Sequence, residues 1–258
     1  MEKAKGAKES YTKEEREISR LFNNISPHYD RLNLLLSFGL DRYWRRVLVK
    51  RVVADGAERV ADIACGTGDI TIALAKRGVE AIGVDIAEEM IAIAEKKSRK
   101  RLEKRVKRGA LAHFPKYILS SAQNIGLPSN HFHCATIAFG IRNFEKREDS
   151  LQEIARVIKE RGKLYILEFS TPKRSPFKEL YSFYFNKIVP IIGRIVSGNK
   201  GAYSYLPYSV AHFPQPAHFA EELHSAGFEE VKYSALTGGV AFLYQATKRE
   251  AAKSEAAK

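Results

Sequence analysis

The stretch Val60-Ala-Asp-Ile-Ala-Cys-Gly-Thr-Gly-Asp69 carries the strongest local signal in the chain. Its first half is a short apolar run, typical of a buried strand, and its second half is a turn that contains Gly66 and Gly68. Glycine lets the backbone approach a ligand closely, and the helix that starts at once offers free N–H groups. A Walker phosphate loop is excluded because no Gly-Lys-Ser/Thr follows, and Ala64 replaces the first glycine of a dinucleotide fingerprint.

A carboxylate follows this turn at an informative distance. Asp85 ends the next apolar run, Ile82-Gly-Val-Asp85, nineteen residues beyond Gly66. An acid at the end of the second strand is placed to accept both ribose hydroxyls of an adenosine-containing ligand. The alternative interpretation of Asp85 is an N-cap of the following helix. Turn and acid together predict a nucleoside ligand.

Strand and helix patterns alternate along most of the chain. Strands are predicted at 59–64, 80–84, 117–120, 134–139, 163–169, 231–236 and 240–246, and helices at 18–36, 70–76, 87–107, 148–159 and 219–226, with Arg161-Gly162 ending the helix at 148–159. This alternation predicts βαβ units and a largely parallel sheet in an α/β protein. We expect a polar N-terminal tail at 1–17, a single domain at 18–247 and a C-terminal tail at 248–258.

The motif D-x-x-x-G-T-G beginning at Asp62, with Asp85 on the second strand, resembles the class I methyltransferases that use S-adenosylmethionine. The resemblance implies a Rossmann-like, mostly parallel seven-stranded sheet flanked by helices, with S-adenosylmethionine as the cofactor. In such sites the glycine turn faces the methionine moiety and the acid binds the ribose. This part of the pattern serves many chemistries, so it indicates a cofactor and not a methyl acceptor.

Six further stretches narrow the resemblance. They are Phe22-Asn-Asn-Ile-Ser-Pro-His-Tyr-Asp-Arg-Leu-Asn33, Ser37-Phe-Gly-Leu-Asp-Arg-Tyr-Trp-Arg-Arg46, Phe139-Gly-Ile-Arg-Asn-Phe144, Leu164-Tyr-Ile-Leu-Glu-Phe-Ser170, Tyr203-Ser-Tyr-Leu-Pro-Tyr-Ser209 and Ala226-Gly-Phe228. Together they resemble the ubiquinone/menaquinone-biosynthesis C-methyltransferase family over residues 18–247. The stretch 139–144 is the most specific, because amino-group methyltransferases carry an Asn/Asp-Pro-Pro-aromatic motif there. The resemblance implies N-terminal helices and an inserted helical lid near 173–215.

The family pattern also implies cofactor contacts at particular positions. These are Asp62, Gly66, Thr67, Gly68, Asp85, Ser121, Ala122, Ala138 and Asn143. Ser121 stands where an Asp or Asn usually contacts the adenine amino group, Ala138 where a Ser is common, and His133 where an Asp is usual. We therefore expect adenine to be held through a hydroxyl or backbone groups, at a cost of about 1 kcal/mol for one lost hydrogen bond.

Arg142 and Tyr29 are the predicted catalytic residues. Methyl transfer from a sulfonium needs an electron-rich carbon held close to the methyl group, with water excluded. The guanidinium of Arg142 stays charged, so it suits a role in polarising a quinol hydroxyl or steadying its phenolate. It is not a base, which leaves Tyr29, His28, His212 or a water to take the proton. The alternatives are an ion-pair role for Arg142 and packing or surface roles for the others.

Composition limits the compartment. The chain has 258 residues, of which 45% are hydrophobic and 28% charged, as in soluble globular proteins. No run approaches the roughly 18 apolar residues of a spanning helix, and no signal core is visible, so a cytoplasmic location is expected. Cys65 and Cys134 are too few for a disulfide framework or a zinc cluster, and no metal is predicted. Cys134 is expected to pack in the core rather than act as a nucleophile.

The net charge of +13 is concentrated in residues 95–108, where nine Lys/Arg face only Glu95 and Glu103. Such a run favours an anionic partner, and a solvated basic helix is an equal alternative. Nucleic acid is not favoured, because the chain lacks basic residues interleaved with aromatic ones. We expect peripheral contact with an anionic membrane, at its inner face.

Residues 176–197 form a dense aromatic and aliphatic segment that suits a prenyl tail. Lys178, Lys187 and Arg194 interrupt it and Pro190 kinks it, so it does not span a bilayer. Three interpretations of this segment remain open. It could cover an apolar channel, lie at an interface beside the basic helix, or be an ordinary core lid.

The leading hypothesis is C-methylation of the ring of a prenylated demethylquinol, first a demethylmenaquinol and second a ubiquinone precursor. A C-methyltransferase for a sterol, a tocopherol precursor or another lipophilic or aromatic molecule remains open. A cofactor-binding scaffold without catalysis, an RNA-associated protein and a homodimeric assembly remain open as well.

Overall fold

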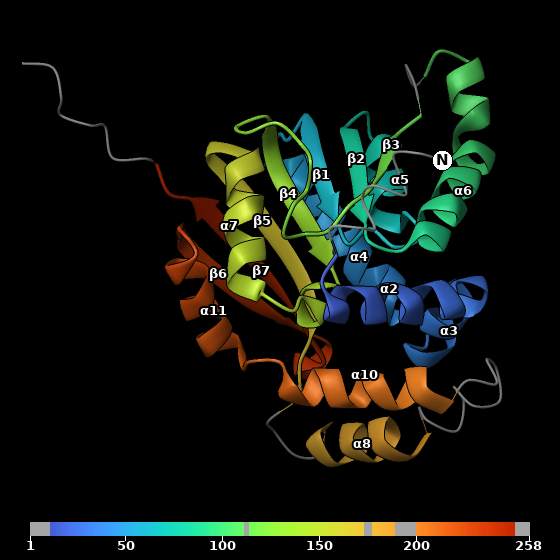
Figure 1. The fold of residues 1–258 in the computed structure, drawn as a ribbon, viewed down its shortest axis with the longest axis vertical. Helices are drawn as coiled ribbons and strands as arrows, with labels where there is room; N and C mark the ends of the chain where they lie inside the picture. Colours follow the sequence, from blue (N-terminus) through green and yellow to red (C-terminus); the bar gives the residue numbers. More distant parts are fainter. Residues whose placement is uncertain (1–10, 111–113, 173–176, 189–199, 251–258) are drawn as a thin grey trace, which may run out of the picture.

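The computed structural model describes residues 11–110, 114–172, 177–188 and 200–250 (Figure 1). Seven strands form a sheet in the order β3-β2-β1-β4-β5-β7-β6. Strands β1 to β5 pair in parallel, whereas β7 is antiparallel to β5 and β6. The strands are β1 Arg59–Ile63, β2 Glu80–Asp85, β3 Lys116–Leu119, β4 Phe132–Ala138, β5 Ile158–Phe169, β6 Phe228–Leu236 and β7 Ala241–Lys248. The predicted mostly parallel, seven-stranded α/β fold is confirmed.

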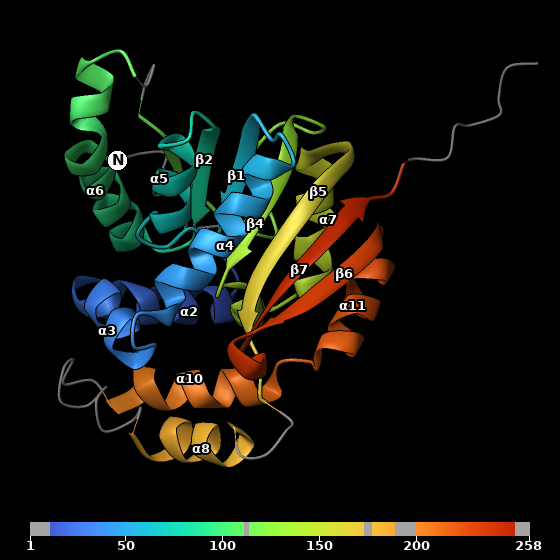
Figure 2. The same ribbon diagram turned by 180° about the vertical axis from the view of Figure 1, so that it is seen from behind.

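Side chains of the central strands alternate between two cores, one on each face of the sheet. Val60 and Cys134 pack with α4 (Leu40–Ala54) and α5 (Asp69–Ala75). The next residues along each strand, Ala61 and Ala135, pack with α7 (Arg147–Val157) and α11 (Pro216–Ser225). Figures 1 and 2 show the two helix layers on opposite faces. Burial on both faces explains why β1 reads as a continuous apolar run.

A second group of helices lies beyond the carboxyl ends of the parallel strands (Figure 1). It consists of α2 (Lys13–Ile25), the short η1 (Ser26–His28), α3 (Tyr29–Leu36), α8 (Phe177–Phe183), the π-helical turn η3 (Tyr184–Ile188) and α10 (Lys200–His212). Open α/β sheets bind their ligands at this edge. These helices therefore cover the place where a site is expected.

The basic segment lies elsewhere. It occupies the second half of α6 (Glu88–Lys107), which flanks the β3 edge of the sheet. In both views this half of α6 extends away from α8 and α10 (Figures 1 and 2). The described part of the aromatic segment, residues 177–188, therefore does not lie beside the basic half of α6.

The N-terminal helix begins earlier than predicted. It starts at Lys13 instead of Ile18, because Thr12 and Glu15 form a capping box. Residues 13–17, expected to belong to a polar tail, are thus helical, and Tyr11 is buried. The predicted continuous helix to Leu36 is interrupted at Ser26–His28, where Pro27 cannot continue the hydrogen-bond ladder.

Two other boundaries differ from the prediction. Helix α7 ends at Val157, and β5 begins at the next residue, so Arg161-Gly162 lies inside a strand and does not end a helix. Arg161 adopts a left-handed φ of 60°, and the pairing of β5 with β4 shifts register nearby. Helix α4 was not predicted at all, although its Trp44, Leu48 and Val52 are buried with the spacing of one helical face.

Some predictions fall outside the described residues. These include Pro190 and Arg194 of the aromatic segment and residues 251–258 of the C-terminal tail.

Candidate functional site

The two glycines of the turn after β1 have different roles. Both have left-handed φ angles, 53° for Gly66 and 78° for Gly68. A Cβ at Gly68 would lie 2.6 Å from the hydroxyl oxygen of Tyr117, so this glycine is needed for packing. A Cβ at Gly66 would instead face the Tyr29 ring at 3.7 Å. Gly66 therefore presents backbone to the site, and Gly68 anchors the turn on the core.

Asp85 ends β2 directly opposite this turn. Its Oδ2 accepts a 2.7 Å hydrogen bond from the Gly66 N–H, and its Oδ1 accepts one of 2.9 Å from the Ala87 N–H. The N-cap of α6 is Ala87, so the N-cap interpretation of Asp85 is wrong. Burial raises the pKa of Asp85, and the backbone hydrogen bonds only partly offset it. A carboxylate has about four lone-pair sites, so two remain for a ligand.

Asp62 makes its hydrogen bonds within the protein. The N–H and hydroxyl of Thr71 donate to Oδ2 at 3.0 and 2.5 Å, and the Thr136 hydroxyl donates to Oδ1 at 2.7 Å. Only 1% of Asp62 is exposed, and burial raises its pKa to about 6 despite these bonds. Asp62 thus ties β1 to α5 and β4 and holds the turn in place.

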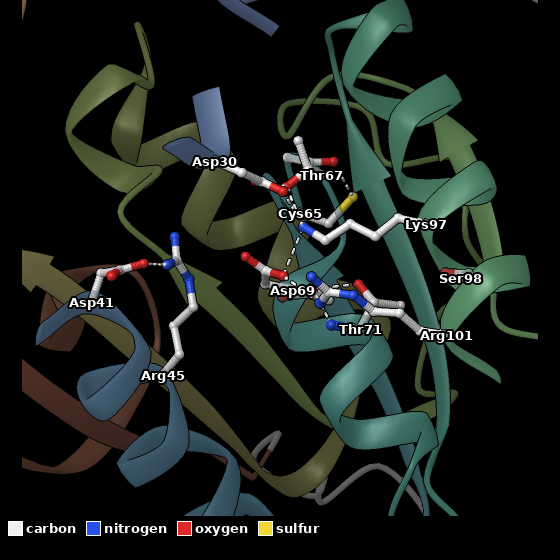
Figure 3. A network of polar contacts seen from close by, with 12 residues as sticks. Asp30, Asp41, Arg45, Cys65, Thr67, Asp69, Thr71, Lys97, Ser98 and Arg101 are labelled. Atoms are coloured by element: carbon white, nitrogen blue, oxygen red, sulfur yellow. Dashed lines mark hydrogen bonds and ion pairs between the residues drawn. The ribbon is translucent and has the colours of Figure 1, made fainter. Parts of the chain in front are cut away.

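Thr67 belongs to a polar network that ties three segments together (Figure 3). Its hydroxyl donates to Asp30 of α3 at 2.6 Å and accepts from the Lys97 ammonium of α6 at 2.9 Å. Lys97 also pairs with Asp30 at 2.6 Å and Asp69 at 2.7 Å. Burial alone would raise the pKa of Asp69, but Lys97, Arg45 and Arg101 outweigh it and hold that pKa below its ordinary value.

A cavity opens between this turn and α2, and we call it the loop cavity. Residues that line it include Glu14, Glu15, Ile18, Phe22, Tyr29, Gly66, Asp85, Met90, Ser120 to Gln123, Ala138 to Gly140 and Asn143 to Glu145. It holds about 790 Å³ of space, counted with its open mouth, within the range of cofactor pockets.

Six of the predicted cofactor residues line the loop cavity: Gly66, Asp85, Ser121, Ala122, Ala138 and Asn143. Asp62, Thr67 and Gly68 do not line it; they support the turn from below. The sequence pattern could not separate these two groups, because it gives positions along the chain and not which side chains face the cavity.

The loop cavity is acidic in an otherwise basic protein. Four carboxylates line it, from Glu14, Glu15, Asp85 and Glu145, and none of its described lining residues is Lys, Arg or His. A phosphate group would be repelled here, whereas a sulfonium ligand would be attracted. The Tyr11 hydroxyl is buried without a hydrogen-bond partner among the described residues. Burial first, and then Glu15, Asp85 and Glu88, raise its pKa, so it is a neutral donor beside these acids.

A second cavity adjoins the first, and we call it the apolar cavity. It is lined by Leu21, Phe22, Ile25, Tyr29, Leu32, Asn33, Leu36, Ser37, Asp41, Arg45, Phe139, Arg142, Phe169, Tyr205 and Leu206. Phe22, Tyr29 and Phe139 line both cavities. An oily guest in one cavity would therefore meet a polar ligand in the other at these three rings.

Arg142 lines the apolar cavity and is also a buried ion-pair partner. Its Nη1 lies 2.8 Å from Oε1 of Glu168, whose side chain is 0% exposed. Its Nε donates to the Ser209 hydroxyl at 3.3 Å, and the guanidinium lies 5.6 Å from the centre of the Phe169 ring. Within the described residues no hydrogen bond uses Nη2. The alternative ion-pair role is thus real, but it leaves one edge of the fork for a ligand.

Tyr29 lies at the junction of the two cavities. Burial raises its pKa, and Arg45, Asn33 and Arg142 offset this only in part. A phenol with a raised pKa stays protonated near neutral pH, so Tyr29 is a hydrogen-bond donor and a poor base. His28 and His212 line neither cavity.

The sequence analysis missed Asp41. It is the only carboxylate among the described residues that line the apolar cavity. Its Oδ1 accepts from the Ser37 hydroxyl at 2.8 Å, and its Oδ2 pairs with Arg45. The signal was available, because Asp41 lies within the stretch 37–46 quoted for the family resemblance.

Two other predicted residues behave as follows. Asn143 accepts a 3.0 Å hydrogen bond from the Tyr205 hydroxyl of α10, so the lid region contacts the site directly. Cys134 is 1% exposed within the core, and burial raises the pKa of its thiol, which confirms its packing role.

No three His, Cys, Asp or Glu side chains cluster as metal ligands in the described ranges. Over the same ranges, no helix is both long and apolar enough to cross a membrane.

Comparisons with known proteins agree with this geometry. A model described as the ubiE/COQ5 methyltransferase family matches residues 9–248. The ubiquinone/menaquinone biosynthesis C-methyltransferase UbiE of Citrifermentans bemidjiense is 42% identical over 236 residues, covering 90% of this chain and 96% of that protein. The demethylmenaquinone methyltransferase of Thermus thermophilus is 40% identical over 227 residues, covering 87% and 98%.

Solved structures share the fold at low sequence identity. Magnesium protoporphyrin IX methyltransferase from Synechocystis, with bound SAM, has a TM-score of 0.62 at 16% identity and covers 93% of this chain and 99% of its own. The cyclase SpnF has a TM-score of 0.66 at 16% identity, covering 92% and 97%. Because a methyltransferase and a cyclase share this architecture, the fold alone does not decide the chemistry.

Proposed function

Because the chain belongs to the ubiE/COQ5 methyltransferase family, we propose that it transfers a methyl group from S-adenosylmethionine to a ring carbon of a prenylated demethylquinol. A demethylmenaquinol is the first choice, in line with the name of the Thermus thermophilus relative, and a ubiquinone precursor is the second. The observation that carries the proposal is the junction of an acidic cavity and an apolar cavity at Phe22, Tyr29 and Phe139.

The loop cavity fits S-adenosylmethionine. Asp85 would accept from the ribose hydroxyls, the Gly66 turn and Asn143 would hold the methionine end, and Ser121 and Ala122 would flank the adenine. The acidic lining matches a ligand with a positively charged sulfur. When bound there, S-adenosylmethionine supplies an already activated methyl group.

The apolar cavity would hold the quinol ring, with Arg142 as its charged partner. A free edge of the guanidinium can stabilise negative charge that develops on a ring oxygen, which makes the ring carbon a better nucleophile. Tyr29, kept neutral by burial, would donate a hydrogen bond at the junction. Aromatic side chains around both groups keep water from the reacting carbon.

Asp41 is our choice for the proton acceptor. The new carbon–carbon bond replaces a ring C–H bond, so one proton must leave the substrate for each methyl group added. Neither Tyr29 nor Arg142 can act as the base. Asp41 can, because it is the carboxylate among the described residues that line the apolar cavity. Ser37 and Arg45 hold it in one orientation.

We further place the enzyme in the cytoplasm, in peripheral contact with an anionic membrane. The contact surface would be the turn at Phe38 together with α8 and η3. Phe38 and Phe183 are 76% and 60% exposed, and the Phe38 ring packs 5.4 Å from that of Tyr184. Lys178 and Lys187 are exposed on the same segment and would meet anionic lipid. Tyr184 also donates to the carbonyl of Leu36, a residue that lines the apolar cavity, so this surface adjoins the cavity proposed for the quinol.

The test is incubation with methyl-labelled S-adenosylmethionine and a panel of reduced demethylquinones with different prenyl tails. Label should enter the ring of the prenylated quinols and should not enter the oxidised quinones, whose ring carbons are not nucleophilic.

The variant Asp85→Ala tests the cofactor site. It should weaken cofactor affinity at least about tenfold, because two charge-assisted hydrogen bonds to the ribose are lost. Glu89→Ala, an exposed acid in the first turn of α6, should bind normally. Wild-type protein that binds the cofactor and labels no quinol would disprove the substrate assignment.

A further inference from the structure

Helix α2 lines the loop cavity and is hydrogen-bonded to three connections at the edge of the sheet. The Ser19 hydroxyl donates to the Ile86 carbonyl at 3.0 Å, after β2. The Glu89 N–H donates to the Asn23 side chain at 3.0 Å, and the Thr12 hydroxyl donates to Glu145, after β4, at 2.5 Å. The third connection, after β3, is contacted by Glu15.

Glu15 is a buried residue of α2 that lines the loop cavity. It is 8% exposed, and its Oε1 accepts from the Ser121 hydroxyl and, at 2.9 Å, from the Gln123 side-chain amide. Its Oε2 accepts from the Thr12 N–H at 2.9 Å as part of the capping box. These three bonds leave about one of the four lone-pair sites of the carboxylate for a ligand.

The position of Glu15 suits the base of an adenosine. Asp85 at the end of β2 takes the ribose, so the base extends toward the next strand of the sheet, β3, and the residues after it, 120–123. An exocyclic amine buried there needs an acceptor. Ser121 is a poor candidate, because its hydroxyl already donates to Glu15 and accepts from the Gln123 N–H. Glu14 and Glu145 are exposed, so Glu15 is the buried acid that remains.

We propose that Glu15 of α2 is the hydrogen-bond acceptor for the exocyclic amine of the adenine, with Ser121 and Gln123 holding the carboxylate in place. This deepens, and rests on, the proposed use of S-adenosylmethionine. The acid that recognises the base thus comes from a helix 106 residues away from Ser121 in sequence. The same carboxylate therefore holds α2 against residues 121–123 and recognises the base. As a result, the site favours 6-amino over 6-oxo purines.

The test compares two ligands that differ at position 6 of the purine and in the N1 proton that comes with the 6-oxo form. Dissociation constants are measured by calorimetry for S-adenosylhomocysteine and for S-inosylhomocysteine, in which a carbonyl replaces the amine. Wild type should prefer the adenosyl ligand by about tenfold or more, as expected for a hydrogen bond to a charged group. Glu15→Ala should lose most of this preference, with little change in the affinity for the inosyl ligand.

Two further variants and two contrary results separate the possibilities. Glu15→Gln keeps the capping box, so it should fold normally and show a smaller selective loss. Glu17→Ala removes an exposed carboxylate of α2 that lines neither cavity, and it should keep the full preference. Equal weakening of both ligands by Glu15→Ala and Glu15→Gln would overturn the inference, because Glu15 would then act only by docking α2. If wild type binds neither ligand, the proposed cofactor itself fails.

Discussion

At the scale of single residues, the proposed role of Asp41 as proton acceptor depends on the negative charge of its carboxylate. Asp41→Asn keeps the shape and removes the base, so turnover should fall about a hundredfold or more while cofactor affinity stays near the wild-type value. Single-turnover kinetics with calorimetry in parallel would measure both. The control is Asp149→Asn, the same substitution at an exposed residue of α7 that lines neither cavity, and its turnover should match that of the wild type. Full turnover in Asp41→Asn would contradict the assignment.

Arg142 requires a variant that respects its ion pair. Arg142→Ala would leave Glu168 as a buried unpaired charge, at a cost of about 3–5 kcal/mol of stability. Arg142→Lys keeps the charge and loses the planar fork, so turnover should fall about tenfold or more with near-normal binding of S-adenosylmethionine. Turnover and cofactor affinity that fall by the same factor would indicate a purely structural role.

At the scale of elements, the carboxyl group of Asp62 links β1 to α5 and β4, and burial in the folded protein favours its protonated form. The folded pKa of Asp62 is about 6, above its ordinary 3.8, so the folded state binds the proton more tightly than the unfolded state. Its favourable contribution is complete below pH 4 and is lost as the pH rises through 6. The loss is about 3 kcal/mol in the free energy of unfolding.

Asp62→Asn removes this titration. Urea unfolding at pH 4 to 7 should show the variant gaining on wild type as the pH rises. Asp69→Asn should show the opposite trend when the titration is extended below pH 4, because Lys97, Arg45 and Arg101 outweigh burial and hold the pKa of Asp69 below its ordinary 3.8, so the wild type loses this stabilisation only as the pH falls below that value. A difference between Asp62→Asn and wild type that does not change with pH would refute the assignment.

At the scale of the whole molecule, two candidate membrane surfaces lie far apart. The exposed aromatic residues are at the end with α8, and the basic half of α6 extends away from it (Figure 2). Vesicles of phosphatidylglycerol and phosphatidylcholine should sediment the wild-type protein, and Phe38→Ser/Phe183→Ser should reduce binding about tenfold. Tyr233→Ser, at an exposed aromatic residue of β6, should bind normally.

Substitution of Lys104 and Arg105 on α6 by Gln separates the two surfaces. If that variant loses vesicle binding and the Phe38/Phe183 variant keeps it, the basic helix is the membrane contact. Analytical ultracentrifugation of the protein without vesicles reports whether it is a homodimer.

Local sequence determined the sheet, the glycine turn and Asp85. Each depends on residues adjacent in the chain: alternating apolar runs, two glycines at left-handed φ angles, and an acid at the end of the next strand. The N-terminal helix boundary was missed because its capping box lies in a polar stretch without an apolar face. Helix α4 shows the signal of a buried face and was overlooked.

Tertiary structure alone decided how the site is completed. Glu15 meets Ser121, Asp30 meets Thr67 and Lys97, and Arg142 meets Glu168. Asp41 faces the cavity of Arg142 only because α3 and α4 pack over the sheet edge. Motif spacing encodes what neighbours along the chain can do together. Contacts between distant segments follow instead from how helices bury their apolar faces on the sheet, which no local pattern records.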